Sequence, residues 1–226
     1  LYNPTQFTYL DSESIPFDFE GSKVDITLNK EEQDYFRTRD ILMVHGLIAG
    51  EHFAFYVMHL PSRIGGKGFD LRSRGAEICY NHAMEMMKKY PGIKIAAMGD
   101  MNDDPVDKSM YQILGAKPEI SKVKDGDMYN PWYNLLAKQG VGTLSYNGAW
   151  NLFDQIVMTP NLLDRAGKKD FSKLTFWKHA IQRMPYLFQT EGKYKGTPKR
   201  TTAGGVWLDG YSDHLPVCVY LVKEQK

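Results

Sequence analysis

The sequence predicts an α/β domain in which short buried strands and a crossover helix build one sheet. Three observations predict this class: apolar runs over residues 40–47 and 53–60, a helical apolar pattern over 71–90, and another short apolar run over 93–98. A strand, a helix and a strand in succession form a crossover, which places two parallel or mixed neighbours in the same sheet.

The first third of the chain is rich in predicted strands. Residues 6–10 alternate between apolar and polar side chains, which is typical of a half-buried strand. The runs 40–47 and 53–60 are joined by Ala49-Gly50-Glu51, a connection short enough for a hairpin.

The helix over 71–90 is predicted by Ile78, Ala83, Met86 and Met87, which recur near helical spacing before Tyr90-Pro91-Gly92 ends the pattern. The strand over 93–98 follows and ends at Gly99-Asp100.

The remaining predicted elements are short. They are helices over 107–114 and 132–138, a turn at Tyr146-Asn147-Gly148, a strand over 152–158 that is interrupted by Asp154, and a final strand over 215–222. We find no internal repeat, low-complexity tract or linker, so residues 1–226 are expected to form a single domain.

Composition narrows the class of protein. A chain of 226 residues with 42% hydrophobic content can bury one substantial core. The net charge of +1 excludes a grossly basic nucleic-acid binder, although it can hide a local basic patch. Cys79 and Cys218 have neither a disulfide framework nor zinc-site spacing. Because no apolar stretch approaches the roughly 20 residues that span a bilayer, we expect a soluble domain of unassigned compartment.

Two polar motifs lie where predicted strands meet solvent. Gly99-Asp100-Met101-Asn102 follows the strand over 93–98, and Ser212-Asp213-His214 precedes the last strand. Carboxylate and amide oxygens suit a hard divalent cation, and a histidine beside them suits proton transfer or phosphate binding. A solvated loop is the alternative for the first motif, and a surface strand end with an incidental His is the alternative for the second.

Three further residues stand out by their context. His59 ends an apolar run, Arg63 offers a planar donor fork for a phosphate, and Asp154 places a charge inside an apolar strand. A buried carboxylate is costly unless it is paired, and a histidine is a common partner at active sites. An edge position facing water is the alternative for Asp154, and a surface arginine is the alternative for Arg63.

The ordered set of four motifs resembles the endonuclease/exonuclease/phosphatase superfamily, the DNase I-like group. The motifs are His59-Leu60-Pro61-Ser62-Arg63, Gly99-Asp100-Met101-Asn102, Phe153-Asp154-Gln155-Ile156 and Ser212-Asp213-His214, and the resemblance covers residues 40–222. The resemblance implies a four-layer α/β sandwich of two mixed sheets flanked by helices. It also implies magnesium-dependent hydrolysis of a phosphoester by an in-line water, with manganese or calcium as other candidate cations.

The resemblance also implies a role for each matching residue. Asp100 would orient or activate the water, and Asn102 would hold a phosphate oxygen. His214 would be the catalytic histidine and Asp154 its orienting carboxylate, while His59 would stabilise the phosphate or help the leaving group. On the metal side, Asp213 and Asp100 would be the ligands.

The front of the chain departs from the family pattern. We find no strand carrying a metal-side Asn and no apolar strand ending in the Glu that is the principal magnesium ligand, since Glu13, Glu20, Glu31 and Glu32 lie in polar segments. We therefore expect the N-terminal part of the fold to be missing from this chain. One sheet would then expose apolar surface or an unpaired edge, and could pair with the missing segment or with a second copy.

The substrate is left open by the sequence. Residues 168–200 carry nine Lys and Arg against two acidic residues, with aromatic side chains interleaved, and this segment could line the cleft and attract a nucleic acid, a phosphorylated small molecule or a phosphorylated lipid. A solvated loop over a core is the alternative. A non-catalytic binding module with the same fold is the alternative function.

Overall fold

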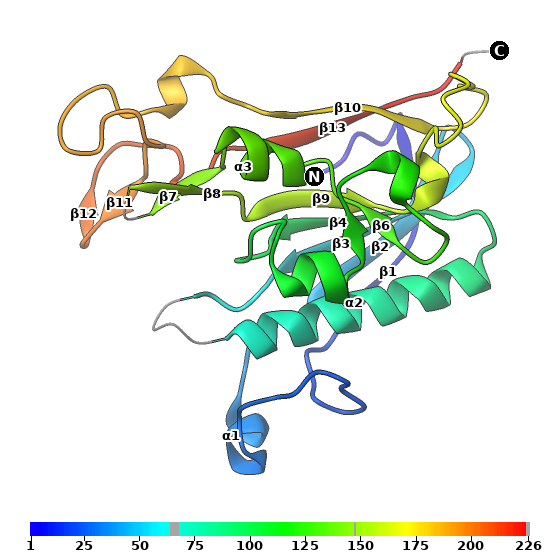
Figure 1. The fold of residues 1–226 in the computed structure, drawn as a ribbon, viewed down its shortest axis with the longest axis horizontal. Coiled ribbons are helices and arrows are strands. Elements are labelled where there is room, and N and C mark those ends of the chain that lie inside the picture. The colour runs from blue at the N-terminus through cyan, green and yellow to red at the C-terminus, as the bar shows by residue number, and fades with distance from the viewer. Residues whose placement is uncertain (64–67, 147, 225–226) are drawn as a thin grey trace.

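A seven-stranded mixed sheet in the order β1-β2-β3-β4-β9-β6-β5 forms the centre of the molecule (Figure 1). The structure is a computed structural model that describes residues 1–63, 68–146 and 148–224. The strands of this sheet are β1 (Phe7–Ile15), β2 (Ile41–Ile48), β3 (Glu51–His59), β4 (Lys94–Asp100), β5 (Ala116–Lys117), β6 (Met128–Tyr129) and β9 (Asp154–Met158). The predicted α/β class is confirmed.

The predicted hairpin and crossover are both present in this sheet. Strands β2 and β3 pair antiparallel around a tight turn in which Ala49 and Gly50 have positive φ. The helix α2 (Phe69–Lys89) then connects β3 to β4, and these two strands pair in parallel. This connection brings the C-terminal ends of β3 and β4 to one edge of the sheet.

Helix α2 covers one face of the sheet (Figure 1). Its Ala76, Cys79 and Ala83 are fully buried in one apolar cluster with Tyr56 and Met58 of β3. Helix α2 begins at Phe69, two residues before the predicted start at residue 71. The first turns are held by polar contacts, which a pattern of apolar residues does not reveal.

Those polar contacts come from the segment over residues 16–36. Asp70 accepts hydrogen bonds from the backbone N and the hydroxyl of Thr27, at 2.7 and 2.8 Å. Glu77 accepts one from the backbone N of Lys23 at 2.9 Å. The segment contains the short helix α1 (Lys30–Tyr35), whose N-terminus is capped by a complete capping box at Asn29.

A second, smaller sheet lies over the opposite face of the central sheet (Figure 1). It pairs β10 (Thr175–Ile181) with β13 (Val217–Val222) antiparallel. Val217, Val219 and Leu221 of β13 pack against a second core cluster that includes Phe53, Ile156 and Met158.

The expected four-layer sandwich of two mixed sheets is therefore only partly observed. Helix α2, the central sheet and the β10–β13 pair form three layers. The second sheet is not mixed in the described part of the chain, because a mixed sheet needs at least three strands and only this antiparallel pair is present. The outer face of the pair exposes Trp177 and Tyr220.

Two apolar side chains of the central sheet are exposed on the face that the β10–β13 pair covers in part. Leu42 and Val57 are cross-strand neighbours of β2 and β3 on the face that also carries Phe55, and they are 44% and 37% exposed. The absence of an N-terminal part of the fold stays a prediction, because two partly exposed side chains do not test it.

The remaining elements of the described residues are short. They are β7 (Leu144–Tyr146), β8 (Ala149–Asn151), β11 (Thr202–Ala203), β12 (Val206–Trp207), α3 (Tyr133–Gln139), a π-helical turn (Ser109–Ile113) and three 3-10 turns (Ile120–Lys122, Pro160–Leu162 and Pro185–Leu187). Both predicted short helices are thus present with shifted ends. In the predicted turn at 146–148, Asn147 lies outside the described residues. No helix in the described ranges is long and apolar enough to cross a membrane.

Candidate active site

Three strand ends bring His59, Asp100 and Asp154 together on one face of the central sheet. The register pairs His59 of β3 with Asp100 of β4, and Asp100 with Asp154 of β9. Side chains alternate between faces along a strand, so Asp100 shares the face of Met98, which packs towards β10 and β13. The site therefore lies on the face of the sheet opposite α2.

Gly99 is required by the close approach of β4 to β3 just before Asp100. Its φ is +139°, and a Cβ at this position would lie 1.8 Å from the carbonyl oxygen of Met58. Only glycine fits here without moving one of the two strands. The glycine of the motif thus sets the position of Asp100 relative to His59.

His214 and Asp154 form a hydrogen-bonded pair. Nδ1 of His214 lies 2.8 Å from Oδ2 of Asp154, and both side chains are partly buried. Burial alone would lower the pKa of His214, but the bond to Asp154 and the negative charges of Asp154, Asp100 and Asp213 raise it. Asp154 thereby fixes Nδ1 as the protonated nitrogen of the ring and leaves Nε2 for other partners.

Asp100 has an environment that favours proton uptake. Burial raises the pKa of its carboxyl, and the neighbouring Asp154 raises it further, against the opposing effects of the Asn102 backbone N–H, His214 and His59. Its Oδ2 lies 3.5 Å from Nε2 of His59. The side chain of His59 is 43% exposed and that of Asp100 is 19% exposed, so the pair is open to a ligand.

Asn102 occupies a tight turn directly after β4. Its φ is +49°, a left-handed conformation that asparagine tolerates better than most residues. Its backbone N donates to Oδ1 of Asp100 at 2.9 Å, and its Nδ2 donates to the carbonyl oxygen of Leu60 at 2.9 Å. One side-chain N–H and the amide oxygen of Asn102 have no partner among the described residues, so the amide can still contact a ligand.

Arg63 is held by the loop that follows Asn102. Its Nε donates to the carbonyl oxygen of Asn102 at 2.7 Å, and its guanidinium contacts the carboxylates of Asp103 at 3.1 Å and of Asp107. It also lies over the ring of Phe153, 4.5 Å from the centroid. The side chain predicted to bind phosphate is thus engaged in fixing the Asn102 turn.

Comparison of the sequence with models of known protein families identifies the family of the chain. A model of the Endonuclease/Exonuclease/phosphatase family matches residues 8–223. The chain belongs to this family. No curated protein matches it by sequence.

Solved structures with the same fold are distant in sequence. An endonuclease/exonuclease/phosphatase family protein from Bacteroides thetaiotaomicron is 14% identical, with a TM-score of 0.55 over 100% of this chain and 69% of its own. Truncated TDP2 from Caenorhabditis elegans is 16% identical, with a TM-score of 0.54 over 97% of this chain and 68% of its own. A mannosyl-6-phosphatase from Bacteroides thetaiotaomicron VPI-5482 is 15% identical, with a TM-score of 0.53 over 98% and 69%.

These likenesses establish the fold. The chain spans about two thirds of the length of these three proteins, and 49% of the human nocturnin catalytic domain, which is 15% identical with a TM-score of 0.47 over 69% of this chain.

Asp213 lies beside the His214–Asp154 pair, just before β13. Residues 212–214 are outside regular structure, so Asp213 and His214 need not diverge as they would on a strand. The carboxylate of Asp213 lies 3.4 Å from the guanidinium of Arg200 and is half exposed. Its charge nevertheless contributes to the raised pKa of His214, which is the next residue in the chain.

The metal ion implied by the family fits this donor set only in part. No group of three or more His, Cys, Asp or Glu side chains among the described residues is arranged to hold a metal. Magnesium usually takes one or two protein carboxylates and completes its shell with water and substrate phosphate. Asp100 and Asp213 have the oxygen chemistry for such a share.

Sequence reasoning missed the polar network that supports the site. Asp103 is 1% exposed and accepts hydrogen bonds from Nε of Arg72 and from the hydroxyl of Ser109, both at 2.6 Å. The fully buried Gln155 donates to the carbonyl oxygens of Asp103 and Leu152. The polar Gln155 inside the apolar strand over 152–158 was the available signal, since a buried amide requires partners.

Proposed function

We propose that this chain is a phosphoester hydrolase that uses Mg²⁺ and attacks the phosphorus with a water molecule. The observation that carries the proposal is the convergence of Asp100, Asp154, His59 and His214 on one sheet face, with the His214–Asp154 bond at 2.8 Å. The carboxylate of Asp100, a base, and the imidazolium of His214, an acid, lie together there, and the pKa of each group is raised.

In the proposed reaction, Asp100 is the general base. Its carboxylate accepts a proton from water as the water oxygen bonds to phosphorus, and its raised pKa makes it a stronger base than a free Asp. The ester bond on the opposite side of the phosphorus breaks, and the leaving oxygen takes a proton. His59, which is exposed beside Asp100, is the proposed donor of that proton.

Protonated His214 stabilises the charge that develops on the phosphate. With Nδ1–H bound to Asp154, its Nε2–H is free to donate to a non-bridging phosphate oxygen. The free N–H of Asn102 is the proposed second donor. Because the Asn102 turn is fixed by Arg63 and Leu60, this donor is pre-positioned.

Asp213 would hold the divalent cation, and the chemistry that the cation supplies when bound would be neutralisation of the phosphate charge. Since the described residues contain no three-ligand cluster, its remaining ligands would be water, substrate oxygens or side chains outside this chain. Pairing of the open sheet with another segment or a second copy stays a prediction, and sedimentation of the purified chain measures the second case.

The test is hydrolysis of bis(p-nitrophenyl) phosphate and p-nitrophenyl phosphate with added Mg²⁺. We expect turnover that is abolished by chelator and reduced at least 100-fold by Asp100→Asn, with Asp125→Asn as a matched surface control whose activity is unchanged. Asp125 is suitable because its side chain is 90% exposed. Chelator-resistant turnover would overturn the metal requirement.

A non-catalytic module is the second candidate function, and the same assay distinguishes it. Its supporting observation is the lack of a complete metal cluster in the described part of the chain. No hydrolysis of either ester by a folded protein saturated with Mg²⁺ would favour this alternative.

A further inference from the structure

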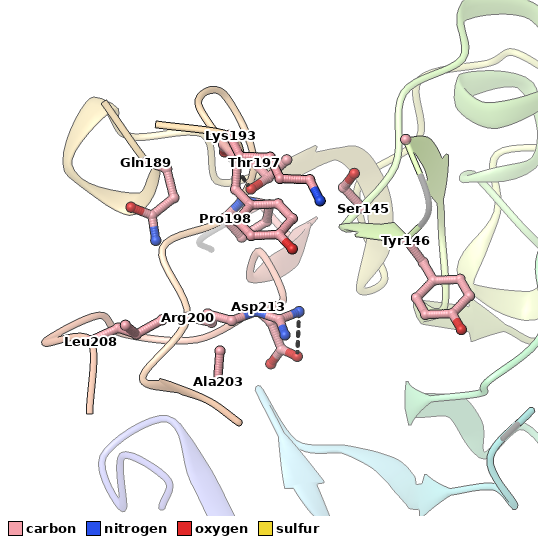
Figure 2. Close-up of a pocket in the computed structure, with 12 residues that line it drawn as sticks. Ser145, Tyr146, Gln189, Lys193, Thr197, Pro198, Arg200, Ala203, Leu208 and Asp213 are labelled. Atoms are coloured by element: carbon pink, nitrogen blue, oxygen red, sulfur yellow. Dashed lines mark hydrogen bonds and ion pairs between the residues drawn. The ribbon is translucent and has the colours of Figure 1, made fainter. Parts of the chain in front are cut away.

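A pocket of about 510 Å³ opens beside Asp213, between the β7–β8 hairpin and the segment over residues 189–213. Figure 2 shows that its lining comes from elements far apart in sequence, with Ser145 and Tyr146 on the hairpin side and Gln189, Lys193 and Thr197 on the loop side. Its volume is that of a site for one small molecule.

The pocket is joined to the proposed active site through Asp213. This residue lines the pocket and is directly followed by His214, so the two Cα atoms are about 3.8 Å apart. The dashed contact in Figure 2 is the 3.4 Å pair between Asp213 and Arg200. A phosphate bound at His214 would therefore have the rest of its molecule within reach of the pocket.

The charge of the pocket favours an anion. Lys193 and Arg200 line it together with Asp213, and Arg200 is paired with that carboxylate. No carboxylate of the described residues lies within ion-pair distance of Lys193, whose ammonium is instead 5.5 Å from the centroid of the Tyr194 ring. In Figure 2 the amine of Lys193 extends towards the β7–β8 hairpin, across the pocket. This cation is thus available to a ligand.

The rest of the lining suits a ring that carries hydroxyl groups. Tyr146 and Tyr194 are 67% and 63% exposed, and exposed rings of this kind stack on the flat faces of sugars or bases. Ser145 and Gln189 add a hydroxyl and an amide, which can donate and accept hydrogen bonds.

The basic segment over residues 168–200, which the sequence suggests as a lining of the cleft, is divided into two parts in the structure. Strand β10 crosses the molecule, so the basic residues of the segment 168–173 precede one end of the strand and those of the segment 193–200 follow its other end (Figure 1). Only the second group is near the pocket.

We propose that this pocket binds the alcohol portion of a small phosphate ester, a hydroxylated ring with a second anionic group, while the phosphate to be cleaved lies at Asp100 and His214. Lys193 contacts the second anionic group, and Tyr194 packs on the ring. The inference rests on the proposed function for the position of the cleaved phosphate, and on the pocket alone for the recognition of the ring and its charge.

The experiment measures binding without turnover. Isothermal titration calorimetry in the presence of chelator compares glucose 1,6-bisphosphate with glucose 1-phosphate on the full chain, on Lys193→Ala and on Tyr194→Leu. Lys168→Ala is the matched control, since it removes an exposed lysine of the same segment at the far end of β10. We expect the bisphosphate to bind at least 10-fold more tightly than the monophosphate. We also expect each pocket variant to lose about 10-fold, about 1.4 kcal/mol, and Lys168→Ala to lose nothing.

Two results would overturn the proposal. One is equal affinity for both sugar phosphates in all four proteins. The other is tighter binding of a single-stranded oligonucleotide that Lys168→Ala weakens as much as Lys193→Ala, because that result describes an extended surface. Failure of the pocket is distinguishable from failure of catalysis, since hydrolysis of bis(p-nitrophenyl) phosphate by the unchanged chain tests catalysis separately.

Discussion

Asp100 and Asp154 lie directly opposite each other in the antiparallel pair of β4 and β9, and the imidazole of His214 is bonded to Asp154. Two carboxylates at neighbouring positions repel, which contributes to the raised pKa of Asp100, while their summed charge raises the pKa of His214. The register of one strand pair therefore sets the protonation of both proposed catalytic groups.

The first prediction concerns Asp154→Asn and the pH dependence of kcat/KM. The unchanged protein should gain activity as pH rises through the pKa of Asp100, above its usual 3.8, and lose it as pH rises through that of His214, above its usual 6.5. Removing the charge of Asp154 lowers both pKa values, so both limbs of the profile should move to lower pH. We also expect kcat to fall about 100-fold, because Nδ1 loses its orienting carboxylate.

Asp125→Asn is the control for this profile, since it removes a carboxylate on the surface. A basic limb at the same pH in Asp154→Asn and in the unchanged protein would show that His214 is not the group that loses its proton there.

The second prediction concerns Gly99→Ala. The new Cβ would meet the carbonyl oxygen of Met58 at 1.8 Å, so β4 must move away from β3 at the position that holds Asp100. Gly92→Ala is a matched control, because Gly92 also has positive φ but has no atom within 4 Å of its Cβ position. We expect Gly92→Ala to lower the free energy of unfolding by about 1 kcal/mol and Gly99→Ala by at least twice as much.

Urea unfolding measures both glycine variants, and hydrolysis of bis(p-nitrophenyl) phosphate follows their effect on the site. Equal losses of stability in the two proteins would mean that backbone conformation, and not the close approach of β3, explains Gly99.

The third prediction separates two roles for Arg63. If Arg63 fixes the Asn102 turn, Arg63→Met should lower kcat about 10-fold with little change in KM. It should also lower the free energy of unfolding by about 1–3 kcal/mol, because Asp103 and Asp107 lose a charged partner. A phosphate contact predicts the opposite: KM rises and stability is unchanged. Arg165→Met, which removes a half-exposed arginine from a surface pair with Asp125, is the control.

The sequence predicted the elements whose signal is local. Apolar spacing predicts the hairpin over β2 and β3, the helix α2 and the strand β9. The charge of Asp154 inside an apolar strand predicts a partner, and His214 lies 2.8 Å away. Strand β10 was not identified, because its Trp177, Lys178 and His179 resemble a basic aromatic loop.

Long-range contacts explain what the sequence could not show. Arg63 looked free for phosphate, since nothing in a linear sequence indicates that Asp103 and Asp107, about 40 residues later, fold back onto it. The pocket beside His214 has the same origin, because its walls at Ser145 and Lys193 come from separate elements.

The last prediction concerns Glu51, which connects the far ends of the two sheets. Its carboxylate pairs with Lys94 of β4 and with Lys223, 2.8 Å away beyond β13, and accepts the backbone N–H of Leu174 at 2.9 Å. Burial acts to raise the pKa of Glu51, but these three bonds lower it from 4.5 to about 2. A carboxyl with a depressed pKa stabilises the fold above its unfolded value of 4.5, and this contribution is lost as pH falls from 4.5 towards 2.

Glu51→Gln should therefore lower the free energy of unfolding at pH 7 by up to about 3 kcal/mol, the equivalent of that pKa shift. Urea unfolding at a series of pH values measures the difference from the unchanged protein, and we expect it to shrink below pH 4.5. Glu119→Gln is the matched control, because Glu119 pairs with Lys122 in solvent and should cost less than about 1 kcal/mol. A Glu51→Gln difference that stays constant from pH 7 to pH 3 would contradict the argument, since it would show that packing of the side chain, and not its charge, holds the two sheets together at this end.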